Sequence, residues 1–527
     1  MRGFRIIILL CCLQVLPASL IGQTAPEKQE IEIIRADALR FSERNNVKSY
    51  LLEGNVILQQ GTTKLYCDSA YLFSSSNRAA AYGHVHINEA DSIHVYGDSA
   101  LYDGNSKVVR IFENVRLTDR QMVLTTQLLT YRLNERLGIY YNGGTLRSQE
   151  AVLTSKTGYY YGDPQTAYFK DSVRLKHPDY RLEADTLEYN TGSDIAYFHG
   201  PTTIYNENST VFCKDGYYVT PTGIAVFNQD ARLDNPPQTL LADSIYYDRE
   251  TGLGKAYGNI VFSDTVQSII QYSEEALYNE INNVITSTRG SVAGYVMEDD
   301  TLFIAGDTIR IEQDSLERNV MFVYPNVRMF KSDFQGVCDS LYYSDADSII
   351  RLFRSPVLWS DSNQFSGDTI FLALKNQQLE RMYFKSNGFI INEDDSLIYN
   401  QIKGRQITAF FNDNDLYKVT VKGNGESIYF GKDEVDRYLG VNQAQCSDID
   451  MYIKEQQFSR IVFKGKPEAV FTPMQRIDPG TFLLEGFSWQ IDRRPKDRAA
   501  LFQPVEGNQD EGVEENPSLL RSSQKEG

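Results

Sequence analysis

Apolar and polar residues alternate along most of the chain, with the period of two that is typical of strands with one buried face. Val56 and Leu58, and then Leu65 and Cys67, occupy alternate positions on either side of a short polar stretch. Nowhere between such groups is there a helical pattern of about ten residues, which disfavours parallel strands joined by crossover helices. Tyr (34) and Phe (27) are abundant, and aromatic residues favour strands. The pattern predicts an all-β fold of antiparallel strands.

A short motif recurs along this pattern: a small residue, then Asp, then Ser, Thr or Ala. Cys67-Asp68-Ser69 and Gly97-Asp98-Ser99 are two copies, and Cys213-Lys214-Asp215 is a degenerate one. The Asp residues of the clear copies are Asp37, Asp68, Asp98, Asp185, Asp243, Asp307, Asp339 and Asp368. Their spacings are 31, 30, 87, 58, 64, 32 and 29 residues, and the three long ones are multiples of 29 or 32. The chain is therefore an internal repeat.

A second landmark follows each Asp by roughly 17 to 21 residues: a turn residue pair and then an apolar residue. Gly54-Asn55-Val56, Gly83-His84-Val85 and Gly258-Asn259-Ile260 are examples. Two landmarks in phase predict about fourteen two-strand units of roughly 30 residues each, from Ile31 to about Gln490. Stacked units of this kind share one continuous apolar face, so we expect an elongated antiparallel β-solenoid.

The two ends of the chain differ from the repeats. Residues 1–22 combine Arg2 and Arg5 with a short apolar run, which predicts a secretory signal peptide cleaved after Gly22. Residues 23–490 form the predicted repetitive domain, and residues 491–527 form a charged tail that we expect to be disordered. No later stretch is long and apolar enough to cross a membrane as a helix. The formal charge of −18 is unfavourable for coating nucleic acid.

The sequence offers little chemistry for catalysis. Cys67, Cys213, Cys338 and Cys446 lie far apart in the slot that Ala and Gly fill elsewhere, so we interpret them as packing residues. The repeated Asp is interpreted as a capping residue that bonds backbone N–H groups, because a glycosidase needs one special carboxylate pair. His84, His86 and His94 could meet, but no carboxylate or Cys in register completes a metal site. We expect no enzyme activity, no metal and no cofactor.

The repeats resemble a known family. Leu65-Tyr66-Cys67-Asp68-Ser69-Ala70-Tyr71 and Tyr82-Gly83-His84-Val85-His86-Ile87 are similar to units of the OstA-like (organic solvent tolerance) family, which includes periplasmic lipopolysaccharide-transport bridge proteins and the N-terminal periplasmic domain of the outer-membrane translocon. The resemblance covers most of the chain from Ile31 to about Gln490, and two or three consecutive family units could fill it. It implies an antiparallel β-jellyroll, folded over like a taco, whose apolar interior holds lipid A acyl chains.

The inward positions that are in phase with the repeat are the candidate lipid-binding residues. They are Val56, Leu58, Val85, Ile87, Val115, Leu117, Val173, Leu175, Ile260 and Phe262, with Val327, Met329, Val357 and Trp359 further along. A closed core uses the same residue types as a lipid groove, so both interpretations stay open. Lipid phosphates are expected outside the groove, near bases such as Arg174, Lys176 and Arg181.

The resemblance implies a non-enzymatic periplasmic carrier that passes lipopolysaccharide toward the outer membrane. Its implied partners are lipopolysaccharide and other transport components, which would bind through terminal strand edges and hold the protein near the outer membrane. The alternative is a structural or adhesive surface β-solenoid that binds protein or glycan. An open apolar groove favours the carrier, whereas a closed core with external binding loops favours the adhesin.

Overall fold

The computed structural model describes residues 29–44, 47–89, 93–119, 122–148, 151–162, 166–190, 192–297, 300–375, 378–412, 415–454 and 457–503. The predicted signal peptide, residues 1–22, lies outside them, as do residues 504–527 of the predicted tail. The chain forms two compact units, residues 1–164 and 165–527. The described residues form strands and short 3-10 turns, and the predicted all-β antiparallel fold is confirmed.

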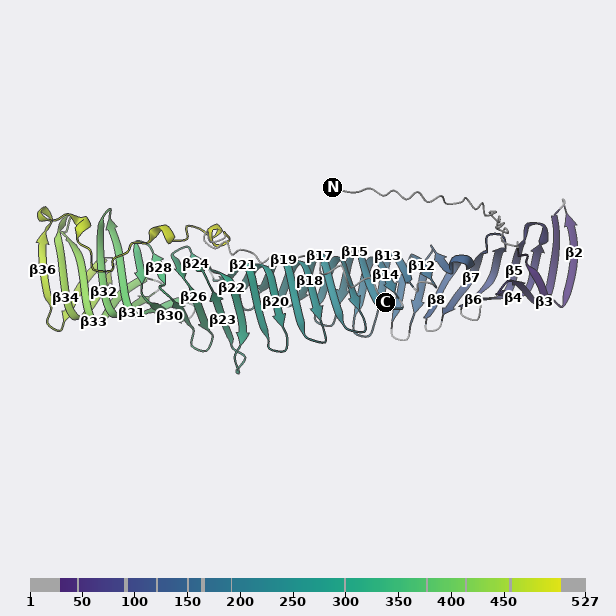
Figure 1. Ribbon diagram of the computed structural model, residues 1–527, viewed down its shortest axis with the longest axis horizontal. Coiled ribbons are helices and arrows are strands. Elements are labelled where there is room, and N and C mark those ends of the chain that lie inside the picture. Colours follow the sequence, from purple (N-terminus) through teal and green to yellow (C-terminus); the bar gives the residue numbers. More distant parts are fainter. Residues whose placement is uncertain are drawn as a thin grey trace, which may run out of the picture. The chain divides into compact units, whose positions relative to one another are not determined.

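Unit 1 consists of short and long antiparallel strands with two 3-10 turns (Figure 1). Its elements are β1 Glu32–Arg35, β2 Ala38–Arg44, β3 Val47–Gln60, β4 Thr63–Phe73, η1 Ser74–Ser76, β5 Arg78–Glu89, β6 Ile93–Asp103, β7 Val108–Asp119, β8 Met122–Arg132, η2 Leu133–Glu135, β9 Leu137–Tyr140, β10 Gly144–Arg147, β11 Val152–Ser155 and β12 Thr157–Tyr161.

Unit 2 begins with regular strands that follow one another in chain order (Figure 1). These are β13 Thr166–Lys176, β14 Arg181–Asn190, β15 Ile195–Tyr205, β16 Thr210–Val219, β17 Ile224–Asn235, β18 Gln238–Asp248, β19 Leu253–Asp264, β20 Ile269–Asn279, β21 Val284–Val296 and β22 Thr301–Gln313.

Shorter strands and then longer ones complete unit 2. They are β23 Asn319–Tyr324, β24 Val327–Lys331, β25 Phe334–Cys338, β26 Ser340–Ser344, β27 Ile349–Phe353, β28 Val357–Ser360, β29 Asn363–Ser366, β30 Thr369–Lys375, β31 Gln378–Asp395, β32 Ile398–Asn412, β33 Asp415–Lys432, β34 Tyr438–Lys454, β35 Gln457–Lys464 and β36 Glu468–Pro473. The turns η3 Met474–Arg476, η4 Pro479–Thr481, η5 Ile491–Arg493 and η6 Ala499–Leu501 follow.

In the regular repeats, alternate long strands are interrupted near their middle by a corner. In β3 the residues Gly54 and Asn55 both have positive φ, and the pairing register with β4 shifts at this point. The same interruption occurs at Gly83-His84 in β5 and at Gly258-Asn259 in β19. A corner of two left-handed residues bends the strand, so each strand contributes one segment to either side of the bend.

The repeated Asp lies against the corner of the strand that follows it. The Asn114 side-chain amide donates to the Asp98 carboxylate at 2.7 Å, and Asn259 donates to Asp243 at 2.9 Å. The two landmarks of the sequence repeat are therefore in direct contact. We predicted that Asp would bond backbone N–H groups, but in these repeats it accepts a side-chain amide of the corner instead, because the corner turns that amide toward the preceding strand.

Gly83 illustrates why the first corner position favours glycine. Its φ is 76°, and a Cβ placed on it would lie 2.3 Å from Oδ2 of Asp68. Gly83→Ala is therefore expected to lower the free energy of unfolding by roughly 1–3 kcal/mol, as other left-handed non-glycine positions do. Urea denaturation followed by circular dichroism measures this change. Gly431→Ala, where the nearest atom would be 3.9 Å away, should have a much smaller effect; equal losses would contradict the corner argument.

The bend produces two ladders that pack face to face, which unit 2 shows most clearly. After β22 the strands separate at the corners: β23 pairs with β26, and β24 pairs with β25. The ladder that contains β23 and β26 is called the first, and the ladder that contains β24, β25 and β28 the second. One apolar cluster joins them, with Ile309 and Leu341 from the first and Met329 and Leu358 from the second. The unit is thus an antiparallel sheet folded on itself, with its apolar interior between the two arms.

The segment after β36 does not match the expectation for the tail. Residues 474–503, here called the C-terminal strap, run along the face of the second ladder that is opposite the core (Figure 1). Gln364 donates to Ser488 O at 2.6 Å, Gln401 donates to Phe482 O at 2.9 Å, and Arg494 donates to Gln335 Oε1 at 2.7 Å. Residues 491–503 do not show the predicted disorder, because Arg494 binds Gln335 and Arg328 donates to the backbone oxygens of residues 500, 501 and 503.

Candidate functional site

The ten candidate lipid-binding residues all belong to the apolar interior, but their exposure differs. Eight of them have only 1% to 3% of their surface exposed: Val56, Leu58, Val85, Ile87, Val115, Leu117, Val173 and Ile260. Leu175 and Phe262, both in unit 2, are only half-buried. Val327, Met329, Val357 and Trp359 are also buried; Val327 and Met329 lie in the core between the ladders, whereas Val357 and Trp359 pack in a separate cluster.

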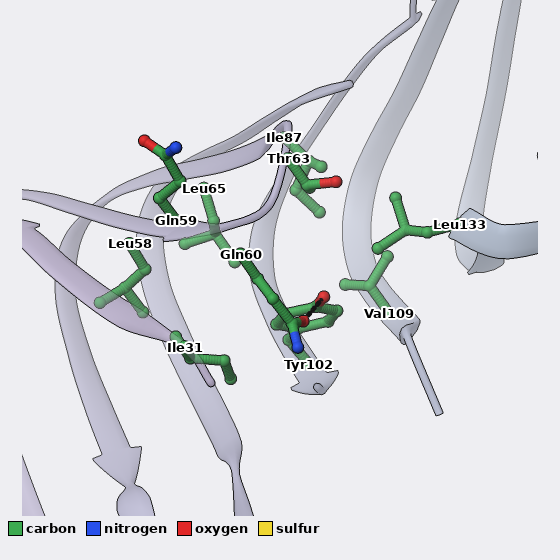
Figure 2. Close-up of a pocket in the computed structure, with 10 residues that line it drawn as sticks. All are labelled: Ile31, Leu58, Gln59, Gln60, Thr63, Leu65, Ile87, Tyr102, Val109 and Leu133. Atoms are coloured by element: carbon green, nitrogen blue, oxygen red, sulfur yellow. Dashed lines mark hydrogen bonds between the residues drawn. The ribbon is translucent and has the colours of Figure 1, made fainter. Parts of the chain in front are cut away.

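The interior of unit 1 is nearly filled by its own side chains. A small pocket remains at one end, beside Leu58, Leu65 and Ile87 (Figure 2), and it holds about 280 Å³ of empty space including the part open to solvent. Without the part that is open to solvent, it has room for about one water molecule. The pocket is therefore too small to extend along the six candidate residues of this unit.

A hydrogen-bonded group closes that end of unit 1. The Gln60 amide donates to the backbone oxygens of Gln29 and Gly104, each at 2.8 Å, and its own oxygen accepts from the Tyr102 hydroxyl (Figure 2). The Ile31 N–H donates to Asn77 Oδ1 at 2.9 Å. Burial raises the pKa of Tyr102, so this hydroxyl stays protonated and keeps donating. The segment Gln29–Ile31 is thus fixed across the interior of unit 1.

The inner face of β17–β20 is different, because its large apolar side chains remain partly exposed. Phe227, Leu233 and Leu240 pack against a cluster of buried residues, yet each side chain remains partly exposed to solvent. The buried part of this cluster consists of Ala231, Ala242, Ile245, Ala256 and Ile260. We call Phe227, Leu233, Leu240 and Phe262 the open inner face. The large side chains of this face are thus less buried than their counterparts in unit 1, such as Leu58 and Leu117.

A polar group lies at the end of the open inner face, on β20 and β21. Gln271 donates to the Ser287 hydroxyl at 2.5 Å, and both side chains are buried. Ser273 and Ser291 are also buried, and their hydroxyl oxygens have no hydrogen-bond partner among the described residues. Unpaired buried hydroxyls cost stability unless a water molecule or a ligand bonds them. This end of the open inner face can therefore accept a hydrogen-bonding group.

Sequence reasoning missed Phe227, Leu233 and Leu240. The corner of β17 is Gln229-Asp230, whose φ angles are 57° and 60°, and Ala231 follows it. It lacks the Gly-Asn-Val signature that marked the other units. The spacing was nevertheless available, since Asp230 lies 29 residues before Asn259 at the next corner.

The other residues singled out by the sequence have structural roles. Cys67, Cys213, Cys338 and Cys446 are free thiols, and burial raises the pKa of the first three to about 12. A thiolate is therefore not populated at neutral pH.

The three histidines do not converge. His84 Nδ1 lies 2.8 Å from Asp68 Oδ2 at a corner, whereas His86 Nε2 lies 3.1 Å from His94 Nδ1. The hydrogen bond to Asp68 raises the pKa of His84, and burial lowers that of His86. Within the described ranges no group of His, Cys, Asp and Glu side chains could hold a metal ion, and no helix is long and apolar enough to cross a membrane.

The predicted basic residues of β13 and β14 lie outside the interior. Arg174 and Lys176 alternate with the buried Val173 and the half-buried Leu175, so they point away from the inner face. Arg174 Nε lies 4.0 Å from Glu183, and Arg181 stacks on Tyr205 with 4.3 Å between its guanidinium carbon and the ring centroid. Their role toward lipid phosphates stays a prediction.

The fold and the interior define a class: an all-β repeat protein whose antiparallel strands fold back around an apolar interior. Residues 28–185 and 181–243 match the family described as OstA-like protein. This match over residues 28–243 confirms the resemblance found in the repeats. Downstream of residue 243 the same contact continues, for example from Asn387 to Asp368 at 2.9 Å.

Comparison with individual proteins adds one structure. No curated protein matches the chain. Among solved structures the chain is similar to the crystal structure of LptH from Pseudomonas aeruginosa, the LptA-homologous periplasmic component of the conserved lipopolysaccharide transport device. The two are 13% identical with a TM-score of 0.20, and the match covers 21% of this chain and 83% of LptH.

Proposed function

We propose that this protein is a non-enzymatic lipid carrier of the periplasm that binds acyl chains on its inner face and passes lipopolysaccharide toward the outer membrane. The observation that carries the proposal is the open inner face of β17–β20, where large apolar side chains stay partly exposed within an OstA-like fold. The LptH likeness agrees with this role but is too low to support it alone.

Burial of apolar groups alone can hold an acyl chain at such a site, without any chemical step. Burying a methylene group contributes about 0.8 kcal/mol, so an acyl chain that covers several exposed side chains is held firmly. The open inner face is a better acyl site than the packed interior of unit 1, because a chain can lie on it without displacing core side chains. Of the ten candidates, Phe262 belongs to the open inner face; a role in lipid binding stays a prediction for all ten.

Strand edges are the proposed contacts to other transport components. In unit 1, the described pairings of β1 and β2 are both with β3, and the two strands carry exposed Ile34, Leu39 and Phe41. In unit 2, β36 pairs with β34 and carries exposed Val470 and Phe471. Open strand edges with exposed apolar residues favour the addition of a strand from a partner.

One observation favours the alternative, a structural or adhesive surface β-solenoid. The interior is packed in unit 1 and again between the two ladders of β22–β34, as expected of a solenoid that only supports external binding sites. Carrier and adhesin make opposite predictions for the open inner face.

Site-specific photocrosslinking to lipopolysaccharide separates the two functions. A crosslinker placed at Phe227, Leu233 or Leu240 is expected to give lipid adducts, whereas Asp98 and Asp243, which face outward, serve as controls. Leu58 and Leu117 should react weakly, because the packed interior of unit 1 leaves no space for a chain. Adducts at none of the inward positions, with the protein folded by circular dichroism, would refute the carrier and favour the solenoid.

A further inference from the structure

The outer face of β31–β35 carries a regular alternation of aromatic and basic side chains. In register across these five strands lie Arg381, Phe410, Lys418, Tyr452 and Arg460. The Lys418 ammonium lies 5.6 Å from the ring centroid of Phe410 and 5.3 Å from that of Tyr452, and the Arg381 and Arg460 guanidiniums lie 5.7 Å and 5.9 Å from the same two rings. These contacts hold the cations in one plane across the sheet.

A second row on the same face adds further cations. Lys385, Lys422 and Lys464 lie four positions along their strands from the first row, with Gln406 and Asp448 between them. The two rows and the residues between them contain six cations and two carboxylates, Asp448 and Asp450, so the face has a formal charge of 6 − 2 = +4. The whole chain has a charge of −18, so this basic face stands out against its surroundings. We call it the cationic face; its residues are Arg381, Lys385, Lys418, Lys422, Arg460 and Lys464.

Most of these charges are not neutralised within the protein. Lys464 donates to Asp450 at 2.5 Å, and Arg381 lies 3.6 Å from Glu380. Within the described part of the chain, Lys385, Lys418, Lys422 and Arg460 form no ion pair with a carboxylate. Unpaired cations on an exposed face attract an anionic partner, and folding alone does not require them.

We propose that the cationic face docks this end of unit 2 onto an anionic lipid bilayer. The five strands of the cationic face span about 20 Å, and its two rows lie about 14 Å apart. A face of this size matches an extended anionic surface better than a small anion. Aromatic rings between cations match the water–lipid boundary, where tyrosine and basic residues gather. A single soluble phosphate would contact only one or two of the cations, whereas a layer of lipid phosphates can contact both rows.

This inference concerns where the protein is held, and it does not depend on what the inner face binds. Vesicle co-sedimentation of the full chain tests it, with vesicles of phosphatidylcholine alone and vesicles that also contain phosphatidylglycerol. We expect binding to the anionic vesicles only, and a decrease as the salt concentration rises, because charge attraction near a bilayer is screened.

The triple variant Lys418→Gln, Lys422→Gln, Arg460→Gln is expected to bind anionic vesicles at least tenfold more weakly. The control variant Arg289→Gln, Arg310→Gln, Arg318→Gln removes the same net charge from ion-paired positions elsewhere in unit 2 and should bind nearly as the wild type does. Circular dichroism and thermal melting confirm that both are folded. Equal weakening by the two variants, or equal binding to neutral and anionic vesicles, would overturn the proposal.

Discussion

Replacing Trp359 by alanine is expected to lower the free energy of unfolding of unit 2 by about 3–5 kcal/mol, the usual cost of truncating a large buried aromatic residue. Trp359 is 0% exposed and packs with Val337 and Val357 on the face opposite the main core. Its indole N–H donates to Gln364 Oε1 at 3.2 Å. The same amide oxygen accepts from Gln490 N–H at 2.7 Å, so the tryptophan also positions the residue that binds the C-terminal strap.

Two measurements separate these effects. Urea denaturation gives the free energy of unfolding, and hydrogen exchange of residues 474–503 reports release of the C-terminal strap at low denaturant. Val435→Ala, at an exposed position in the turn between β33 and β34, serves as the control and should change stability by less than about 0.5 kcal/mol. A Trp359→Ala variant with near-native stability and unchanged exchange would show that the strap does not depend on this cluster.

The architecture was largely predictable because the repeat encodes a physical contact. The residues between each Asp and the next corner complete the strand that carries the Asp, form one turn, and begin the next strand up to its corner. Asp68 and His84, or Asp98 and Asn114, are 16 residues apart in the chain and adjacent across neighbouring strands. A contact repeated in this way fixes strand length and register together, so two in-phase landmarks suffice to predict antiparallel two-strand units.

Whether the interior is packed or open was not predictable from the same pattern. Leu58 and Leu233 follow their corners at equal distances and are the same residue type, yet Leu58 is buried and Leu233 is partly exposed. The difference comes from the residues they face and from segments distant in sequence, such as Gln29–Ile31, which lies at one end of the interior of unit 1. Alternation along a strand shows which side a residue faces; it does not show how closely the opposite arm approaches.

The C-terminal strap was missed for a related reason. Its charged run predicts solvation, but Arg498 lies 4.4 Å from the ring centroid of Phe303, and Arg494 reaches a buried glutamine. Arginine can cover apolar surface while its charge remains satisfied, so a charged sequence does not exclude a docked segment. The usable signal was the glutamine at otherwise apolar strand positions, since Gln335, Gln364 and Gln401 all bind backbone or side chains of the strap.

The double variant Leu233→Asp, Leu240→Asp is expected to reduce lipopolysaccharide binding at least tenfold, which corresponds to about 1.4 kcal/mol. Both side chains are partly exposed on the open inner face, so carboxylates there remain hydrated while the protein is free. An acyl chain laid across them would remove that hydration and lose its apolar contacts, and both effects oppose binding. Unfolding by urea should change much less than binding does.

Val266→Asp, at an exposed position between β19 and β20 of the same unit, is the matched control and should leave binding unchanged. Affinity measured by displacement of a fluorescent lipid separates the possible sites, because an acyl chain held in the packed interior of unit 1 would not respond to the double variant. Wild-type affinity in a folded double variant would therefore exclude the open inner face as the acyl site. Loss of binding with intact stability would place the acyl chain on the open inner face.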